Sequence, residues 1–150
     1  MTPIRMTRRD LLLTGLGLLL FAGRARAQTP AAVSQADRLA IRRVIQSQLA
    51  AFQRDDGPGA FAHASPMIRE IFVTPENFMA MVKSAYQPVY RPREVAFREL
   101  AILEGAPAQE VYLVGPNGQA VIALYVMERQ PDGSWRINGV SLLQVPGATA

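Results

Sequence analysis

The sequence predicts an α+β domain in which N-terminal helices pack on a curved, four-stranded antiparallel sheet. Between residues 34 and 85, apolar residues recur at the spacing of one helix face, whereas after Arg93 they follow the two-residue period of a strand. Two turn signals, Asn117-Gly118 and Asp132-Gly133, divide that second part into hairpins. Helices followed by a run of hairpins are expected to cover one face of the sheet.

The first helix is predicted to begin after Ser34. Asp37, three residues later, completes a pattern like a capping box, and its carboxylate suits the positive end of the helix dipole. The pattern predicts an amphipathic helix of about 20 residues that ends near the turn at 55–58. Five apolar residues fall on its buried face: Ile41, Val44, Ile45, Leu49 and Phe52.

Shorter helices are predicted next along the chain. Residues 58–64 and 66–72 each suit a short helix. Thr74 as N-cap and Pro75 at the first helical position indicate a longer one. Residues 86–93 contain two prolines and are therefore expected to be extended or turning.

The first strand is expected to bend near Arg98-Glu99. Val95 and Phe97 alternate with polar residues, but Leu100 and Ile102 are then apolar on what should be the opposite face, which indicates a bulge. The other strands are predicted at 109–115, 120–128 and 135–145. Residues 146–150 are expected to be frayed.

The third predicted strand is apolar on both faces. Because monomers seldom expose a large apolar patch, a second copy of the chain is the simplest cover for the second face, which predicts a homodimer. A strongly curled sheet that is capped by its own chain ends is the alternative. The two faces carry Val121, Ala123, Tyr125 and Met127 on one side and Ile122, Leu124 and Val126 on the other.

Residues 1–27 have the order of a secretory signal peptide: a basic start, an apolar run and a polar stretch that ends in Ala25-Arg26-Ala27. The apolar run is shorter than the roughly 20 residues that span a bilayer. Cleavage after Ala27 is therefore expected, with no stable membrane anchor afterwards. Residues 28–33 then form a flexible N-terminus, and one domain follows over 34–145.

Arg8 and Arg9 precede the apolar run and resemble the twin-arginine export motif. The motif predicts passage of the folded protein into the bacterial periplasm by the export machinery. A general-secretion leader that happens to contain two adjacent arginines is the alternative. Met6 directly precedes the motif and is an alternative start.

The net charge of +4 belongs entirely to residues 1–27, which carry five Arg and one Asp, whereas the rest of the chain carries 11 residues of each sign. The domain therefore has no electrostatic case for binding nucleic acid. The chain contains no Cys and one His. That composition excludes disulfides and metal–thiolate sites and is poor in ligands for a transition metal, so no metal and no cofactor are expected.

Six stretches of the mature chain together resemble the bacterial family of domain of unknown function 4864, within the NTF2-like (cystatin-like) superfamily. The resemblance implies a cone, in which a curved sheet wraps around helices and leaves a pocket at the wide end. It implies no particular activity, because the superfamily holds both enzymes and silent binding domains. The stretches are IQSQLAAFQRDD (45–56), FAHASP (61–66), TPENFMAM (74–81), YQPVYRPR (86–93), IALYVME (122–128) and PDGSWRINGV (131–140).

Three residues are candidates for acid–base chemistry. His63 can transfer protons near neutrality, and Asp55 and Asp56 lie near it in the sequence. Each also has a structural interpretation, because a lone histidine often caps or packs a helix and an Asp pair before Gly-Pro often ends one. Isomerases of the superfamily pair an Asp base with a Tyr, and the first helix here contains no Tyr.

The loop at 86–93 is the best candidate for ligand contacts. Tyr86, Tyr90, Arg91 and Arg93 combine aromatic surface with cationic donors that suit a carboxylate or an aromatic group. In the alternative interpretation, the tyrosines pack the loop onto the sheet and the arginines are solvated. The remaining candidates lie on the last two strands: Tyr125, Trp135 and Asn138.

These observations favour a small exported module that binds a partly apolar ligand or assembles as a dimer, without catalysis. An isomerase or hydratase that uses His63 or Asp55 as a general base is the main alternative. A maturation partner of another exported protein is the second alternative.

Overall fold

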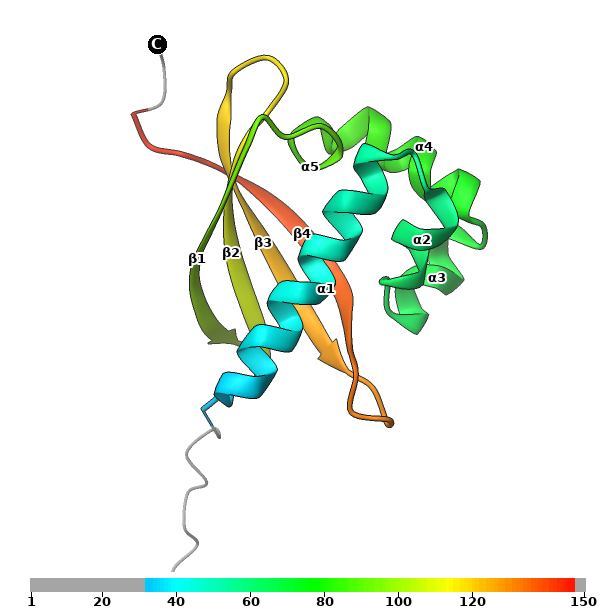
Figure 1. Ribbon diagram of the computed structural model, residues 1–150, viewed down its shortest axis with the longest axis vertical. Coiled ribbons are helices and arrows are strands. Elements are labelled where there is room, and N and C mark those ends of the chain that lie inside the picture. Colours follow the sequence, from blue (N-terminus) through cyan, green and yellow to red (C-terminus); the bar gives the residue numbers. More distant parts are fainter. Residues whose placement is uncertain (1–31, 148–150) are drawn as a thin grey trace, which may run out of the picture.

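The computed structural model describes residues 32–147. Within this range five helices come first and a four-stranded sheet follows, so the chain has the predicted α+β organisation (Figure 1). The predicted leader over 1–27 and the last three residues of the predicted frayed tail lie outside the described residues. No helix in 32–147 is long and apolar enough to cross a membrane.

Each helix of residues 32–147 except the last begins where a side-chain cap accepts from a backbone N–H group of its first turn. Ser34 Oγ accepts from the N–H of Asp37 at 3.1 Å, and Thr74 Oγ1 accepts from the N–H of Asn77 at 3.2 Å, which confirms both predicted N-caps. The helices are α1 (Gln35–Gln53), α2 (Gly57–Ala62), α3 (Pro66–Phe72), α4 (Pro75–Ala85) and α5 (Gln87–Tyr90).

The prediction that residues 86–93 are extended or turning is wrong for their first half. Gln87–Tyr90 forms one helical turn, closed by the N–H of Arg91 bonding to the carbonyl of Gln87 at 2.9 Å. Pro88 is compatible with this turn because the first N–H groups of a helix have no helical partner.

The sheet is antiparallel with the strands in chain order: β1 (Glu94–Leu103), β2 (Ala106–Val114), β3 (Ala120–Arg129) and β4 (Trp135–Gln144). The β1–β2 register shifts between Phe97 and Leu100, which confirms the predicted bend. A second shift, which was not predicted, lies opposite Val126 and Met127 and leaves Asn138 on β4 without a cross-strand partner.

The turn between β1 and β2 lacks the usual sequence signal of a hairpin. Glu104 and Gly105 have φ angles of 49° and 84°, as in a two-residue hairpin with left-handed residues at both central positions. Because Glu stands at the first position, the usual Asn-Gly or Asp-Gly signal for such a turn is absent. In the predicted turn at Asn117-Gly118, only Gly118 has a positive φ.

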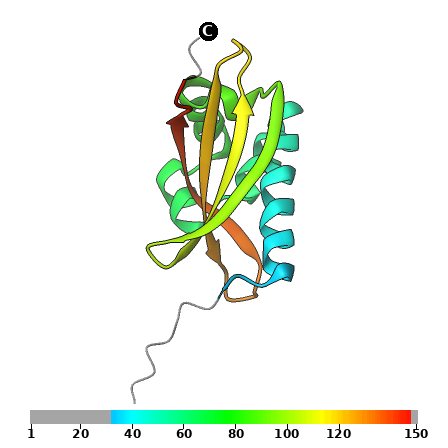
Figure 2. The same cartoon turned by 90° about the vertical axis from the view of Figure 1, so that its left-hand side faces the viewer.

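The two faces of the sheet are different. The helices lie on one side, and α1 runs diagonally across the sheet (Figures 1 and 2). Tyr125 on β3 and Ile41 on α1 are both fully buried in the resulting core. On the other side, the alternate β3 residues Ile122, Leu124 and Val126 are partly exposed. No helix of residues 32–147 lies over this face of the sheet (Figure 2).

Candidate functional site

An apolar cavity of about 380 Å³ lies between the helices and the edge strand β4. Phe52 from α1, Phe78 from α4 and Val140 from β4 form parts of its wall, and Val89 from α5 closes one side. No charged side chain lines it among residues 32–147. A concave apolar space of this size is typical of small-molecule sites.

Phe78 organises the helices around this cavity. Its ring lies 6.2 Å from the ring of Phe52, 5.3 Å from that of Phe61 and 5.7 Å from that of Phe72, measured between centroids. These contacts join α1, α2, α3 and α4 in one aromatic cluster. Helices as short as α2 and α3 are not stable alone, so this packing holds them in place.

The cavity opens beside α3. Ile71 lines the cavity and is nevertheless 63% exposed, so it forms part of the rim. The segment that leads into α3 is anchored on β4: the N–H of Ser65 donates to the carbonyl of Ile137, and the N–H of Ile137 donates to the carbonyl of His63, both at 2.8 Å. The rim helix therefore starts from a fixed point on the sheet.

Two polar side chains line the cavity. Gln48, on α1, is 3% exposed, and its Nε2 donates to the carbonyl of Ala60 at 3.2 Å. The hydroxyl of Tyr86 donates to the carbonyl of Val140 at 3.1 Å. Of the residues that the sequence predicted as ligand contacts, Tyr86 is the one that lines the cavity.

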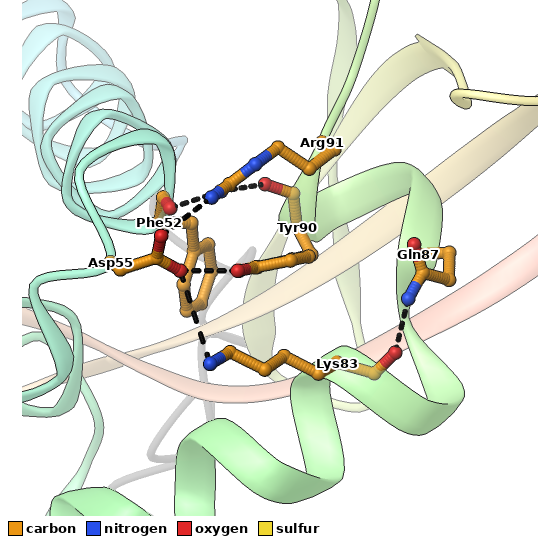
Figure 3. A network of polar contacts seen from close by, with 6 residues as sticks. All are labelled: Phe52, Asp55, Lys83, Gln87, Tyr90 and Arg91. Atoms are coloured by element: carbon orange, nitrogen blue, oxygen red, sulfur yellow. Dashed lines mark hydrogen bonds and ion pairs between the residues drawn. The ribbon is translucent and has the colours of Figure 1, made fainter.

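Tyr90 and Arg91 are instead engaged by Asp55 at the end of α1 (Figure 3). Asp55 has a left-handed backbone with φ of 53°, and its Oδ1 accepts from the Tyr90 hydroxyl. Arg91 Nη2 donates to Asp55 Oδ2 at 2.9 Å, while its Nη1 donates to the carbonyl of Phe52. Lys83 Nζ lies 3.9 Å from Asp55 Oδ1. We call these four side chains, Asp55, Lys83, Tyr90 and Arg91, the Asp55 clasp.

The Asp55 clasp holds α5, and with it one wall of the cavity, against the end of α1. The hydrogen bond from Tyr90 lowers the pKa of the Asp55 carboxyl, and the positive charges of Arg91 and Lys83 lower it further. The same hydrogen bond raises the pKa of Tyr90. A carboxyl whose pKa is lowered by folding stabilises the fold above its unfolded pKa of about 3.9, and this contribution is lost as the pH falls through the lower folded pKa.

Replacing Tyr90 with phenylalanine is expected to raise the pKa of Asp55 towards its ordinary value, because it removes the strongest cause of the lowered pKa. The measurement is an NMR titration of the Asp55 side-chain carboxyl carbon. Tyr86→Phe is the matched control, because the Tyr86 hydroxyl bonds a backbone carbonyl and not Asp55. An unchanged Asp55 titration in Tyr90→Phe would contradict the clasp.

The acid–base candidates His63, Asp55 and Asp56 do not line the apolar cavity. His63 caps the end of α2, and partial burial, aided by the charge of Arg136, lowers its pKa. Asp56 caps the start of α2, with Oδ1 accepting from the N–H of Gly59 at 2.9 Å. Asp55 borders a second, more open hollow of about 410 Å³ between α2 and α4.

Trp135 and Asn138 also take part in structural contacts. Trp135 Nε1 donates to Asp37 Oδ1 at 3.1 Å, which ties β4 to the start of α1. Asn138 Oδ1, on the unpaired residue of β4, accepts from Ser65 Oγ at 2.7 Å. The first bond holds β4 against α1, and the second holds β4 against the residue that caps α3.

The last two candidates, Tyr125 and Arg93, lie away from the cavity wall. Tyr125 is fully buried, burial raises its pKa, and its hydroxyl has no hydrogen-bond partner among residues 32–147. Arg93 joins the start of β1 to β2 through its backbone N–H, which donates to the carbonyl of Val114 at 2.7 Å.

Gln48 is the functional candidate that the sequence analysis missed. It lies three residues after Ile45 and four before Phe52, within the apolar face of α1. A polar residue at the centre of an apolar helix face must find a hydrogen bond when it is buried. That pattern was the signal that could have identified it.

The family model described as "Domain of unknown function (DUF4864)" matches residues 34–150 of the chain. The match covers the helices, the sheet and the cavity between them. No curated protein and no solved structure matches the chain.

Proposed function

We propose that this chain, which belongs to the DUF4864 family, is a non-catalytic binding module that holds a small, largely apolar molecule in the cavity between its helices and β4. The observation that carries the proposal is the cavity itself. It has about 380 Å³ of space, an apolar wall and a mouth beside an exposed isoleucine, Ile71. A ligand bound at this mouth would bury the exposed apolar surface of Ile71.

Catalysis by His63 or Asp55 has less support. A general base must lie within hydrogen-bond reach of its substrate, and neither residue lines the apolar cavity. The Asp55 carboxylate already accepts from Tyr90 and Arg91, so its proton-accepting oxygens are engaged within the chain.

The proposal also includes the superfamily to which the fold belongs. We propose that the domain is a cone of the NTF2-like (cystatin-like) superfamily. Two features support this: the bent first strand, with its register shift between Phe97 and Leu100, and a cavity between the helices and the sheet.

Ile71→Glu is expected to weaken ligand binding by roughly tenfold, because it removes apolar contact and places a charge at the mouth. The probe is 2-naphthol, a small neutral fluorophore, titrated by its own emission. Met67→Glu is the matched control: Met67 is 48% exposed on the same helix and does not line the cavity. Equal binding by both variants would place the probe elsewhere, and no saturable binding to the unaltered protein would overturn the proposed function.

A second function, assembly as a homodimer through the outer face of the sheet, is favoured by a separate observation. Ile122, Leu124 and Val126 form an apolar row that is not covered within 32–147. Arg98 lies 5.1 Å from the ring centroid of Tyr112 beside this row, and Glu110 is the cross-strand partner of Leu124. A second copy that packs on this face would meet a basic and an acidic side chain next to the apolar row.

We also propose that the protein is exported to the periplasm by the twin-arginine route through residues 1–27. A role as maturation partner of another exported protein would follow from the same location. A pull-down from the periplasm at native expression tests that role, and recovery of no partner would contradict it.

Replacing Arg8 and Arg9 together with lysine is expected to abolish export, because it keeps the charge of the leader but removes the arginine pair that defines the motif. The measurement is the fraction of protein in the periplasm. Arg24→Lys with Arg26→Lys is the control within the same leader, and export should continue in it. Unaffected export of the first variant would indicate general secretion.

A further inference from the structure

We propose that the cavity selects a neutral molecule with a hydrogen-bond donor, such as a phenol or an alcohol, over an ether or a carboxylate of the same shape. This inference rests on the proposed binding function and names the class of ligand. It is carried by the way in which Gln48 and Tyr86 are oriented in the cavity wall.

The side-chain amide of Gln48 bonds through its nitrogen and leaves its oxygen without a partner among residues 32–147. The carbonyl of Ala60 can only accept, so the amide must turn its NH₂ group towards it. The amide oxygen, Oε1, then has no donor among residues 32–147. Tyr125 is the residue whose side-chain polar atom is enclosed without a partner in 32–147, so Gln48 Oε1 keeps some accessible surface. Because Gln48 lines the cavity and is 3% exposed, we infer that this surface faces the cavity.

Tyr86 adds a second acceptor to the same wall. Its hydroxyl hydrogen is used in the bond to the carbonyl of Val140, which leaves the lone pairs of the hydroxyl oxygen. Both polar side chains of the cavity therefore offer acceptors. A ligand that carries a donor can pair with both acceptors, whereas an ether oxygen or a carboxylate would face these lone pairs and could pair only with the second hydrogen of the Gln48 NH₂ group.

The charge of the cavity wall and the volume of the cavity restrict the class of ligand further. No charged side chain lines the cavity within 32–147, so a buried carboxylate or ammonium would have no counter-charge. A water-sized group occupies about 30 Å³ in a liquid, so the cavity holds roughly a dozen non-hydrogen atoms. A naphthol, or a medium-chain alcohol, has that size.

The test compares three probes of one shape on the unaltered protein: 2-naphthol, 2-methoxynaphthalene and 2-naphthoate. We expect 2-naphthol to bind at least tenfold more tightly than either of the others. The inference is wrong if all three probes bind equally, or if the ether or the carboxylate binds best. In that case, weaker binding to Ile71→Glu would show that the cavity is still the binding site. If none binds, the proposed function fails with it.

Gln48→Met supplies a second measurement. Methionine has a similar length and lacks the acceptor, so the preference for 2-naphthol over the ether should fall to less than threefold. The urea unfolding midpoint shows whether the variant folds, because the carbonyl of Ala60 loses its donor from Gln48. A preference that is unchanged in a folded Gln48→Met protein would overturn the assignment to Gln48. If the variant does not fold, the three-probe comparison decides.

Discussion

Replacing Phe78 with alanine is expected to lower the free energy of unfolding by about 3–5 kcal/mol, the usual cost of truncating a buried phenylalanine. Phe78 is 6% exposed, and its ring packs against those of Phe52, Phe61 and Phe72. The space left behind would join the existing cavity, so the three neighbouring rings would lose their common packing partner. The measurement is urea unfolding followed by circular dichroism at one fixed protein concentration, because dimer formation would shift the midpoint.

Phe97→Ala is the matched control for Phe78→Ala. Phe97 is a partly buried phenylalanine on β1, outside the aromatic cluster, and its ring has Arg42 over one face at 4.8 Å. We expect its truncation to cost less than half as much. Similar losses in both variants would show that the aromatic cluster does not organise the helices.

Much of this fold could be predicted because the decisive signals are local. Ser34 and Thr74 mark helix starts through bonds to residues three positions away, and the continuous apolar run of β3 is visible without any distant partner. The bend near Arg98 was predicted for the same reason, since the change of face lies within a few residues. The helical turn at Gln87–Tyr90 was not predicted, because proline is common both in turns and in the first turn of a helix. Pro88 alone does not distinguish the two.

The residues that line the cavity and the Asp55 clasp could not be predicted, because they depend on the tertiary fold, whereas a pocket as such was implied by the family resemblance. Tyr90 and Arg91 were predicted to face a ligand, and they bind Asp55, which lies 35 and 36 residues earlier in the chain. Nothing in the composition of 86–93 distinguishes donors that await a ligand from donors that find a carboxylate of the same chain. Ile71 could not be recognised as a rim residue for the same reason, since exposure is a property of the folded protein.

A single charge at the centre of the outer sheet face is expected to dissociate the proposed homodimer. In Leu124→Arg, two guanidinium groups would meet across the two-fold axis without a water shell, so the dissociation constant should rise about 100-fold or more. Leu124 points away from the helices and is partly exposed in the isolated chain, so the variant should fold as well as the unaltered protein. The measurement is sedimentation velocity at tens of micromolar.

Leu39→Arg controls for the added charge. Leu39 is a similarly sized exposed residue on α1, in the helical layer on the other side of the sheet, and a dimer formed by the outer sheet face should tolerate its replacement. A dimer that survives Leu124→Arg and dissociates in Leu39→Arg would place the interface on the helices. An unaltered protein that sediments as a monomer at this concentration would remove the assembly function, while ligand binding in the cavity, which lies on the opposite face of the sheet, would stand independently.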